Sequence, residues 1–192
     1  MAKFINNIWF RCISVLLIIA VVSGALITVL SNLLYVSSEE RTARAIKKIY
    51  GEEKEFTITL DVEQGDSAVE YAFGKIEKIY NVGDDLLFMT TGYNGYKNGT
   101  ITVWVKVVID NESDKIDKVI LQDYDKQTLM SKLGSGYYDG FLTDVTTAYK
   151  EGKDFSAKDE TKLFNPVSGA TMSANAGCNA VNCVIKYLGE NA

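Results

Sequence analysis

The feature that most constrains this chain is a stretch without charge, from Ile13 to Leu34, that consists mainly of Ile, Leu, Val and Ala. Its length matches the roughly 20 residues that an α-helix needs to cross the hydrocarbon core of a bilayer. A cleaved signal peptide is the alternative, but the apolar region of such a peptide spans about 7 to 15 residues and precedes a small-residue cleavage site. We therefore predict a retained transmembrane helix over about residues 13–34, within an N-terminal segment of residues 1–36.

The charges beside this stretch predict its orientation. Lys3 and Arg11 precede it and Glu39 and Glu40 follow it, and the cytoplasmic flanks of membrane spans carry the excess of Lys and Arg. Four basic residues between positions 41 and 48 act against this bias, because they fall within the same window. The balance predicts a single-pass protein of the cell membrane with a cytoplasmic N-terminus and an extracytoplasmic main domain.

Composition limits what the main domain can do. The chain has 47% apolar residues and one proline, which favours a folded domain, predicted over residues 51–192 after a helical connector over residues 37–50. It contains no histidine, the commonest metal ligand and the usual general base, so we predict no catalytic residue and no metal site. Its net charge of −5 argues against a nucleic-acid partner, because a phosphate backbone binds basic surfaces.

The three cysteines, Cys12, Cys178 and Cys183, have none of the paired spacings typical of zinc, iron–sulfur or redox dithiol sites. If Cys178 and Cys183 share a helix, their separation along its axis exceeds the roughly 7 Å limit for a disulfide. We therefore expect the cysteines to have structural roles.

Period-two alternation after residue 50 predicts a sheet. Phe56, Ile58, Leu60 and Val62 alternate with polar residues, which predicts a half-buried strand with these four side chains on its inner face. Further strands are predicted over residues 68–73, 76–80, 86–91, 101–109 and 118–122. In the strand over 101–109, the side chains expected on one face are Ile101, Val103, Val105 and Val107, with Trp104 on the other.

Helical patterns frame this sheet. One helix is predicted over residues 39–50, and a helical pattern after Asp125 is broken at residues 134–136 and resumes over 137–149. The last helix is predicted over residues 173–188, and its buried face consists of Gly177, Val181, Val184, Ile185 and Leu188. No repeat or linker divides residues 50–192. The sequence therefore predicts an α+β fold, with one domain of largely antiparallel sheet and packed helices behind the N-terminal transmembrane helix.

A run of small residues, Asn165-Pro166-Val167-Ser168-Gly169-Ala170-Thr171, stands directly before the last predicted helix. Small side chains let a bulky ligand approach the backbone, and the unpaired N–H groups and positive dipole end of a helix start suit a phosphate. The structural alternative is that Thr171 or Ser173 only caps the helix and that Gly169 only forms a turn. Local chemistry leaves both interpretations open.

Ser168-Gly169-Ala170-Thr171 resembles the S-G-A-T flavinylation motif of the FMN-binding subunits in the Rnf and sodium-translocating NADH:quinone reductase complexes. The order of features is also similar to that family: an N-terminal span, a sheet-rich middle, the Gly92-Tyr93-Asn94-Gly95 turn before a long strand, and the motif at the last helix. The resemblance is greatest to the FMN-binding subunits of Rnf complexes, followed by those of the quinone reductases. It implies an FMN-binding domain in which the Thr171 hydroxyl is joined covalently to the FMN phosphate.

The resemblance implies further flavin contacts beside Thr171, namely Ser168, Gly169, Ala170, Met172 and Tyr93, with Tyr96 as a further neighbour of the flavin ring. The family also has an E-T-P-G-L-G segment, which corresponds here to residues 127–134. In this segment Thr128 and Leu129 are the candidates for lining the flavin. The acid and the proline of the family's segment are absent, since Gln127 stands where the acid is expected.

By the same resemblance, the chain is an electron-carrying flavoprotein subunit rather than an enzyme that acts alone. The whole complex moves electrons between ferredoxin and NAD and couples this to sodium or proton transport. Its implied partners are the other membrane subunits and the flavin transferase that attaches FMN. The alternative from another class is a single-pass extracytoplasmic protein that binds a ligand or partner without a redox role. A hydrolase is disfavoured, because the chain has no G-x-S-x-G motif.

Overall fold

The computed structural model describes residues 8–34, 37–110, 114–134, 137–155 and 168–191. Residues 135–136 of the predicted helix break and residues 165–167 of the small-residue run lie outside this described part. The chain divides into two compact units, residues 1–45 and residues 46–192. The boundary between them falls within helix α3 (Ser38–Tyr50), in the segment predicted as a helical connector.

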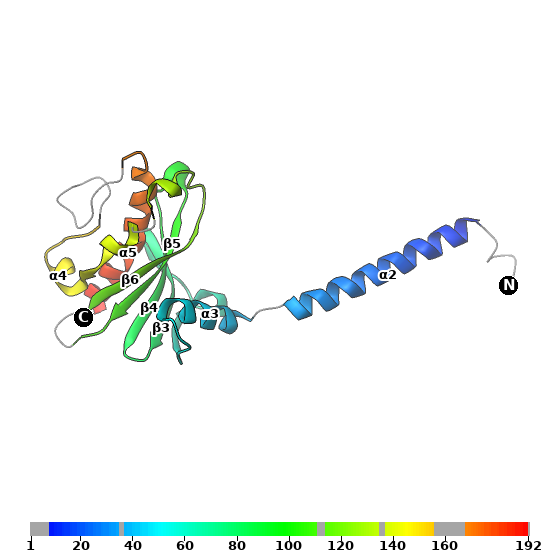
Figure 1. Cartoon of the computed structure of the whole chain (residues 1–192), viewed down its shortest axis with the longest axis horizontal. Coiled ribbons are helices and arrows are strands. Elements are labelled where there is room, and N and C mark those ends of the chain that lie inside the picture. The colour runs from blue at the N-terminus through cyan, green and yellow to red at the C-terminus, as the bar shows by residue number, and fades with distance from the viewer. Residues whose placement is uncertain (1–7, 35–36, 111–113, 135–136, 156–167, 192) are drawn as a thin grey trace. The chain divides into compact units, whose positions relative to one another are not determined.

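The first unit contains the apolar helix α2 (Ile8–Leu34), which includes the predicted membrane span (Figure 1). The helix begins earlier than predicted, and its segment Trp9–Ser31 is long and apolar enough to cross a membrane. Its large apolar side chains are exposed, which suits a lipid surrounding. At the start of α3, the Ser37 hydroxyl accepts a hydrogen bond from the Glu40 N–H at 3.1 Å and so caps the helix.

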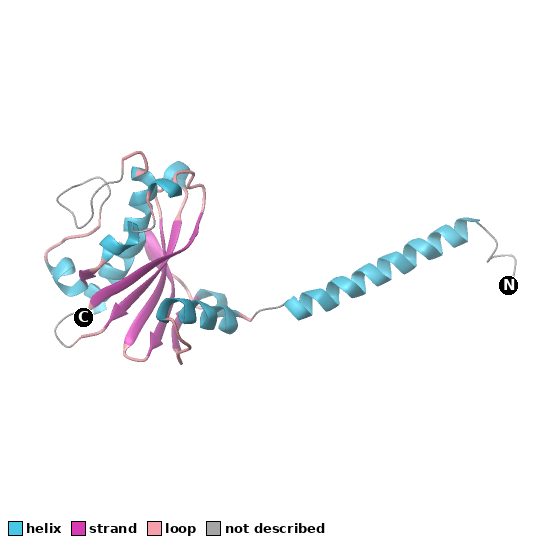
Figure 2. Ribbon diagram, in the orientation of Figure 1, coloured by secondary structure: helices cyan, strands magenta, loops and turns pink. Residues whose placement is uncertain are grey.

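The second unit is built around a sheet (Figure 2), which has seven strands in the described part of the chain. Six of these strands lie in the order β1-β3-β4-β5-β6-β7. All neighbouring strands are antiparallel, and β2 pairs with β3 along the same edge as β1. The strands are β1 (Thr57–Asp61), β2 (Val69–Tyr71), β3 (Gly74–Val82), β4 (Asp85–Gly92), β5 (Ile101–Val108), β6 (Lys115–Tyr124) and β7 (Thr143–Asp144). The predicted α+β class with an antiparallel sheet and packed helices is confirmed.

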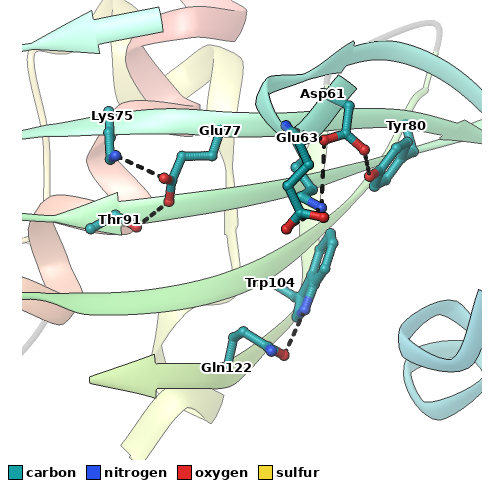
Figure 3. Close-up of polar contacts among 9 residues, drawn as sticks. Asp61, Glu63, Lys75, Glu77, Tyr80, Thr91, Trp104 and Gln122 are labelled. Atoms are coloured by element: carbon teal, nitrogen blue, oxygen red, sulfur yellow. Dashed lines mark hydrogen bonds and ion pairs between the residues drawn. The ribbon is translucent and has the colours of Figure 1, made fainter. Parts of the chain in front are cut away.

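Strand β5 has the two faces that its alternation predicts. The side chains of one face, Ile101, Val103, Val105 and Val107, are fully buried in the core cluster that also contains the inner face of α5 (Thr171–Asn191). Trp104 points to the opposite face, where its ring stacks on Tyr80 with 6.1 Å between ring centroids. Its indole N–H donates to the Gln122 side-chain oxygen at 2.9 Å (Figure 3).

The end of α3 covers part of this opposite face. Ile46 and Ile49 are buried, and the Lys118 ammonium on β6 donates to the Ile49 carbonyl at 2.8 Å. Lys118 pairs with Lys106 of β5. Lys106 is two residues from Trp104 on the same strand, so Lys118 and Trp104 lie on the same face of the sheet. The sheet therefore has helical cover on both faces, over one of them only in part, and Trp104 is 5% exposed.

The prediction for the inner face of β1 is wrong for the last residues of the strand, because a β-bulge shifts the register between Ile58 and Leu60. A slip of one residue exchanges the two faces of a strand. Asp61 therefore lies on the same face as Ile58, opposite Lys78 of β3, and its side chain is only 1% exposed. The Asp61 carboxylate accepts a hydrogen bond from the Tyr80 hydroxyl at 2.6 Å (Figure 3). It also lies 3.5 Å from the Lys78 ammonium. These partners offset the desolvation of a buried charge.

The predicted helix over residues 137–149 is wrong in its first half. This segment forms a 3-10 helix, η4 (Tyr137–Phe141), then strand β7, and only then the short helix α4 (Val145–Lys150). Helix α4 starts late because Asp144 is its N-cap, whose carboxylate accepts from the Thr147 N–H at 2.6 Å. The described part of the segment after Asp125 contains another short 3-10 helix, η3 (Met130–Lys132).

Helix α5 has the predicted buried face, which consists of Gly177, Val181, Val184, Ile185 and Leu188. The helix approaches β4 so closely that a Cβ atom at Gly92 would overlap the Ala176 carbonyl oxygen and the Ala180 nitrogen. Glycine is therefore required at the end of β4 for the helix to pack at this depth.

Cys178 and Cys183 lie on α5 as buried, free thiols. Burial raises the pKa of each thiol to about 12, so neither supplies a thiolate at neutral pH. This agrees with the expected structural role.

The variant Gly92→Ala tests the contact between β4 and α5. Because its methyl group would overlap backbone atoms of the helix, we expect it to lower the free energy of unfolding by roughly 3 kcal/mol or to prevent folding. Gly177→Ala is the matched control, since its Cβ atom would lie 3.5 Å from Tyr137, an ordinary contact, and alanine favours the helix by about 1 kcal/mol. Urea unfolding followed by circular dichroism measures both variants, and equal stabilities would contradict the contact.

Candidate functional site

Helix α5 begins at Thr171, directly after a turn in the small-residue run. Gly169 has a φ of 77°, in the left-handed region that favours glycine. The Ala170 carbonyl accepts the first helical hydrogen bond, from the Ala174 N–H at 2.9 Å, which places Ala170 at the N-cap position. Alanine has no side-chain oxygen, so the cap position belongs to neither Thr171 nor Ser173. The structural alternative of a capping threonine therefore does not describe this helix.

A cavity of about 250 Å³ lies at the start of α5. Its walls consist of Gly169, Ala170, Thr171, Met172 and Ser173, together with Tyr96 and Leu129. The cavity thus joins Thr171 and three of its predicted sequence neighbours to Leu129, which was predicted from a distant segment. Leu129 and Met172 are 36% and 46% exposed, so the cavity has an open, apolar rim.

Gln127 connects the segments that form this cavity, because it bonds Tyr96 and Ser173 and lies two residues before Leu129. The side chain is 4% exposed, and its oxygen accepts hydrogen bonds from the Tyr96 N–H at 3.0 Å and from the Ser173 hydroxyl at 2.8 Å. Its nitrogen donates to the Asp125 carbonyl at 2.8 Å and to the Tyr96 carbonyl at 3.4 Å. The amide is needed because these partners require both donors and acceptors. From the sequence, Gln127 was noted only as the residue that stands where an acid was expected. An amide in place of an acid was the signal that could have indicated its hydrogen-bonding role.

The loop that carries Tyr96 is folded tightly around Gln127. The Gly95 N–H donates to the Gly99 carbonyl at 2.9 Å, and the Gly99 N–H donates to the Tyr96 carbonyl at 2.9 Å. A Cβ atom at either glycine would lie 2.5 Å from the Gln127 nitrogen. The two glycines thus allow the loop to close on the amide, which fixes Tyr96 at the cavity wall.

Three predicted contacts are not part of the cavity wall. Ser168 and Thr128 are exposed neighbours of wall residues. The Tyr93 hydroxyl donates to Glu70 at 3.0 Å, and its carbonyl accepts from the Asn179 side chain at 2.9 Å. Asn179 lies about 12 Å along α5 from Thr171, given the rise of a helix. Burial, with the adjacent Glu70 carboxylate, raises the pKa of Tyr93 to about 12, so the hydroxyl stays protonated at neutral pH.

Two larger hollows lie elsewhere in the described part of the second unit. One, of about 450 Å³, lies over β6 beside Tyr138 and Leu142, and the other, of about 430 Å³, lies beside Phe56 and Asn81. Neither contains a residue of the Ser168–Thr171 motif. Among the described residues, no cluster of three acidic, cysteine or histidine side chains could hold a metal ion. The cavity at Thr171 is therefore the candidate supported by both the sequence motif and the geometry.

The variant Gln127→Glu tests the role of the amide. It keeps the shape but loses both donors and buries a carboxyl group, so we expect the free energy of unfolding to fall by about 1–3 kcal/mol. Burial raises the pKa of a carboxyl group in the folded state, so the loss should grow as pH rises from about 5 to about 8. Thermal unfolding at the two pH values measures this. Gln122→Glu is the control, since Gln122 is exposed and a carboxylate still accepts from Trp104. Wild-type stability of Gln127→Glu at both pH values would show that the amide is dispensable.

Comparison with known proteins assigns no family to this chain. No protein-family model, no curated protein and no solved structure matches it.

Proposed function

We propose that this chain carries FMN bonded covalently through Thr171 and serves as an electron-transfer subunit of a membrane complex. The observation that carries the proposal is the position of Thr171, which opens α5 at the wall of an apolar cavity. The S-G-A-T sequence around it supplies the specific chemistry. The backbone N-cap position belongs to Ala170, so Thr171 is the first residue inside the helix.

The residues of the cavity fit a flavin nucleotide. Leu129, Met172 and Tyr96 offer apolar and aromatic surface to a flat ring, and the first N–H groups of α5 suit a phosphate. Gly169 and Ala170 keep side chains away from the path between the two. The volume of about 250 Å³ is below the roughly 300 Å³ of pockets that enclose a whole small ligand. Part of the nucleotide would therefore stay exposed, as electron exchange with a partner requires.

Thr171 would contribute its hydroxyl oxygen to the attachment. This oxygen would form a bond to the flavin-bearing phosphorus of a flavin dinucleotide, with cleavage of the phosphoanhydride bond and release of a nucleoside monophosphate. The hydroxyl proton would pass to a base of the flavin transferase, since this chain has no histidine to accept it. The product is a phosphodiester, and no electrons are transferred in this step.

Bound FMN supplies one-electron and two-electron chemistry at its ring. The chain's own residues would then have three tasks: Thr171 tethers the cofactor, Tyr96 and Leu129 orient it, and Gln127 keeps their segments in register. None of these tasks requires a catalytic acid or base. The chain would thus relay electrons between neighbouring subunits of an Rnf-type complex, which couples electron transfer between ferredoxin and NAD to the transport of sodium ions or protons.

Helix α2 would anchor the chain in the cell membrane as a single span. Its length and apolar composition support this placement. Lys3 and Arg11 at its N-terminal side support a cytoplasmic N-terminus, which would leave the main domain outside the cytoplasm. A covalent tether would keep the cofactor from diffusing away there.

The variant Thr171→Ala should lose covalent FMN and keep its fold, because alanine has no hydroxyl and Thr171 does not cap the helix. In-gel flavin fluorescence after co-expression with the native flavin transferase measures the attachment, and circular dichroism measures the fold. Ser168→Ala is the matched control, since its exposed hydroxyl lies outside the cavity wall and its flavin should be unchanged. Wild-type fluorescence in Thr171→Ala, with loss in Ser168→Ala, would move the attachment to Ser168 and refute this assignment.

The orientation of the span predicts which parts a protease reaches. Protease added to intact cells, stripped of any outer layer, should cleave the region after residue 37 and leave an N-terminal tag protected until the membrane is permeabilised. The reverse pattern of protection would show that the main domain is cytoplasmic.

A further inference from the structure

Lys132 is a charged side chain beside the Thr171 cavity that lies outside the S-G-A-T motif. It belongs to η3, close to the cavity-wall residue Leu129, and its outer part lies over Gly169. A Cβ atom at Gly169 would be 2.9 Å from the Lys132 ammonium nitrogen, 3.7 Å from its Cδ and 3.9 Å from its Cε. Glycine at 169 thus lets the ammonium group reach the turn that leads into Thr171.

Two hydrogen bonds fix the segment that carries Lys132. The Lys132 N–H donates to the Leu129 carbonyl at 3.0 Å, which fixes the residue to the turn that forms the cavity wall. Gln127, at the other end of the same segment, accepts from the Ser173 hydroxyl in the first turn of α5 at 2.8 Å. The segment that carries the lysine is therefore tied to the helix start that it faces.

The electrostatics at this point favour an anion. The first turn of α5 contains no acidic residue, so no carboxylate of the helix itself balances the positive end of its dipole. Within the described residues, no carboxylate lies at ion-pair distance from Lys132, whereas Lys126 of the same segment pairs with Asp125 at 3.4 Å. In a chain of net charge −5, Lys132 thus brings a positive charge to the start of α5, and within the described residues this charge has no acidic partner.

From these contacts we propose that Lys132 binds the phosphate group of the flavin nucleotide and positions its phosphorus for bond formation at Thr171. The inference rests on the proposed function and adds a positioning residue to it. A lysine suits the task because its ammonium acts as a point charge that can follow the phosphate oxygens during the transfer. The sequence motif alone contains no cation, so the charge must come from another segment of the fold.

The test measures the initial rate of flavin attachment to the full-length chain in detergent, with limiting flavin transferase and intact-mass detection. Loss of one charge-assisted hydrogen bond should slow attachment to Lys132→Met by about tenfold. Lys132→Arg should keep most of the rate, and Lys126→Met, the matched control from the same segment, should be unchanged. The wild-type rate should fall as salt is added, and that of Lys132→Met should depend less on salt. All four proteins should melt at similar temperatures, since Lys132 is exposed.

A wild-type rate in Lys132→Met would overturn the role of Lys132 and leave the proposed function intact. If the wild-type chain itself gains no flavin, the proposed function fails, and a titration with inorganic phosphate then decides the role of Lys132. Phosphate should shift the amide resonances of residues 169–173 in the wild-type chain and not in Lys132→Met. Equal shifts in both proteins, or none in either, would show that Lys132 holds no phosphate.

Discussion

The contact between Gly92 and the backbone of α5 is the constraint on which the candidate site depends. The helix can lie against Ala176 and Ala180 at this depth only because β4 ends in a residue without a side chain. This contact sets the height of α5 over the sheet and thereby the position of its first turn. The loop after Gly92 carries Tyr96 to that same turn, where Gln127 joins the two segments. The packing of α5 on the sheet and the shape of the cavity therefore both depend on the contact at Gly92.

The elements with a clear sequence period were predictable. The alternation over β5 and the helical spacing over α5 both placed their buried faces correctly, because burial on one side imposes a strict period. The errors arose where a local event overrides the period. The bulge in β1 turned Asp61 inward, and Tyr80 and Lys78 compensate its charge from a strand that lies apart in sequence. The Asp144 cap delayed the start of α4 in the same way.

The candidate site was predictable only in part. Of the motif residues, Gly169, Ala170 and Thr171 line one cavity with the predicted contacts Met172 and Leu129, whereas Ser168 lies outside its wall. The roles of Gln127 and Lys132 depend on contacts across the fold, since the first bonds Ser173 and the second lies over Gly169. No spacing within a sequence expresses such contacts. The neutral amide at position 127 also shows why an acid is absent: four hydrogen-bond partners there need both donors and acceptors.

The proposed covalent flavin site is tested most sharply by the intact mass of the wild-type chain purified from its native membrane, followed by mass mapping of its peptides. We predict one population whose mass exceeds that of the polypeptide by one esterified FMN, with the whole excess on the peptide that contains Thr171. A chain with the bare polypeptide mass, or with its excess on another peptide, would contradict a covalent flavin at the start of α5.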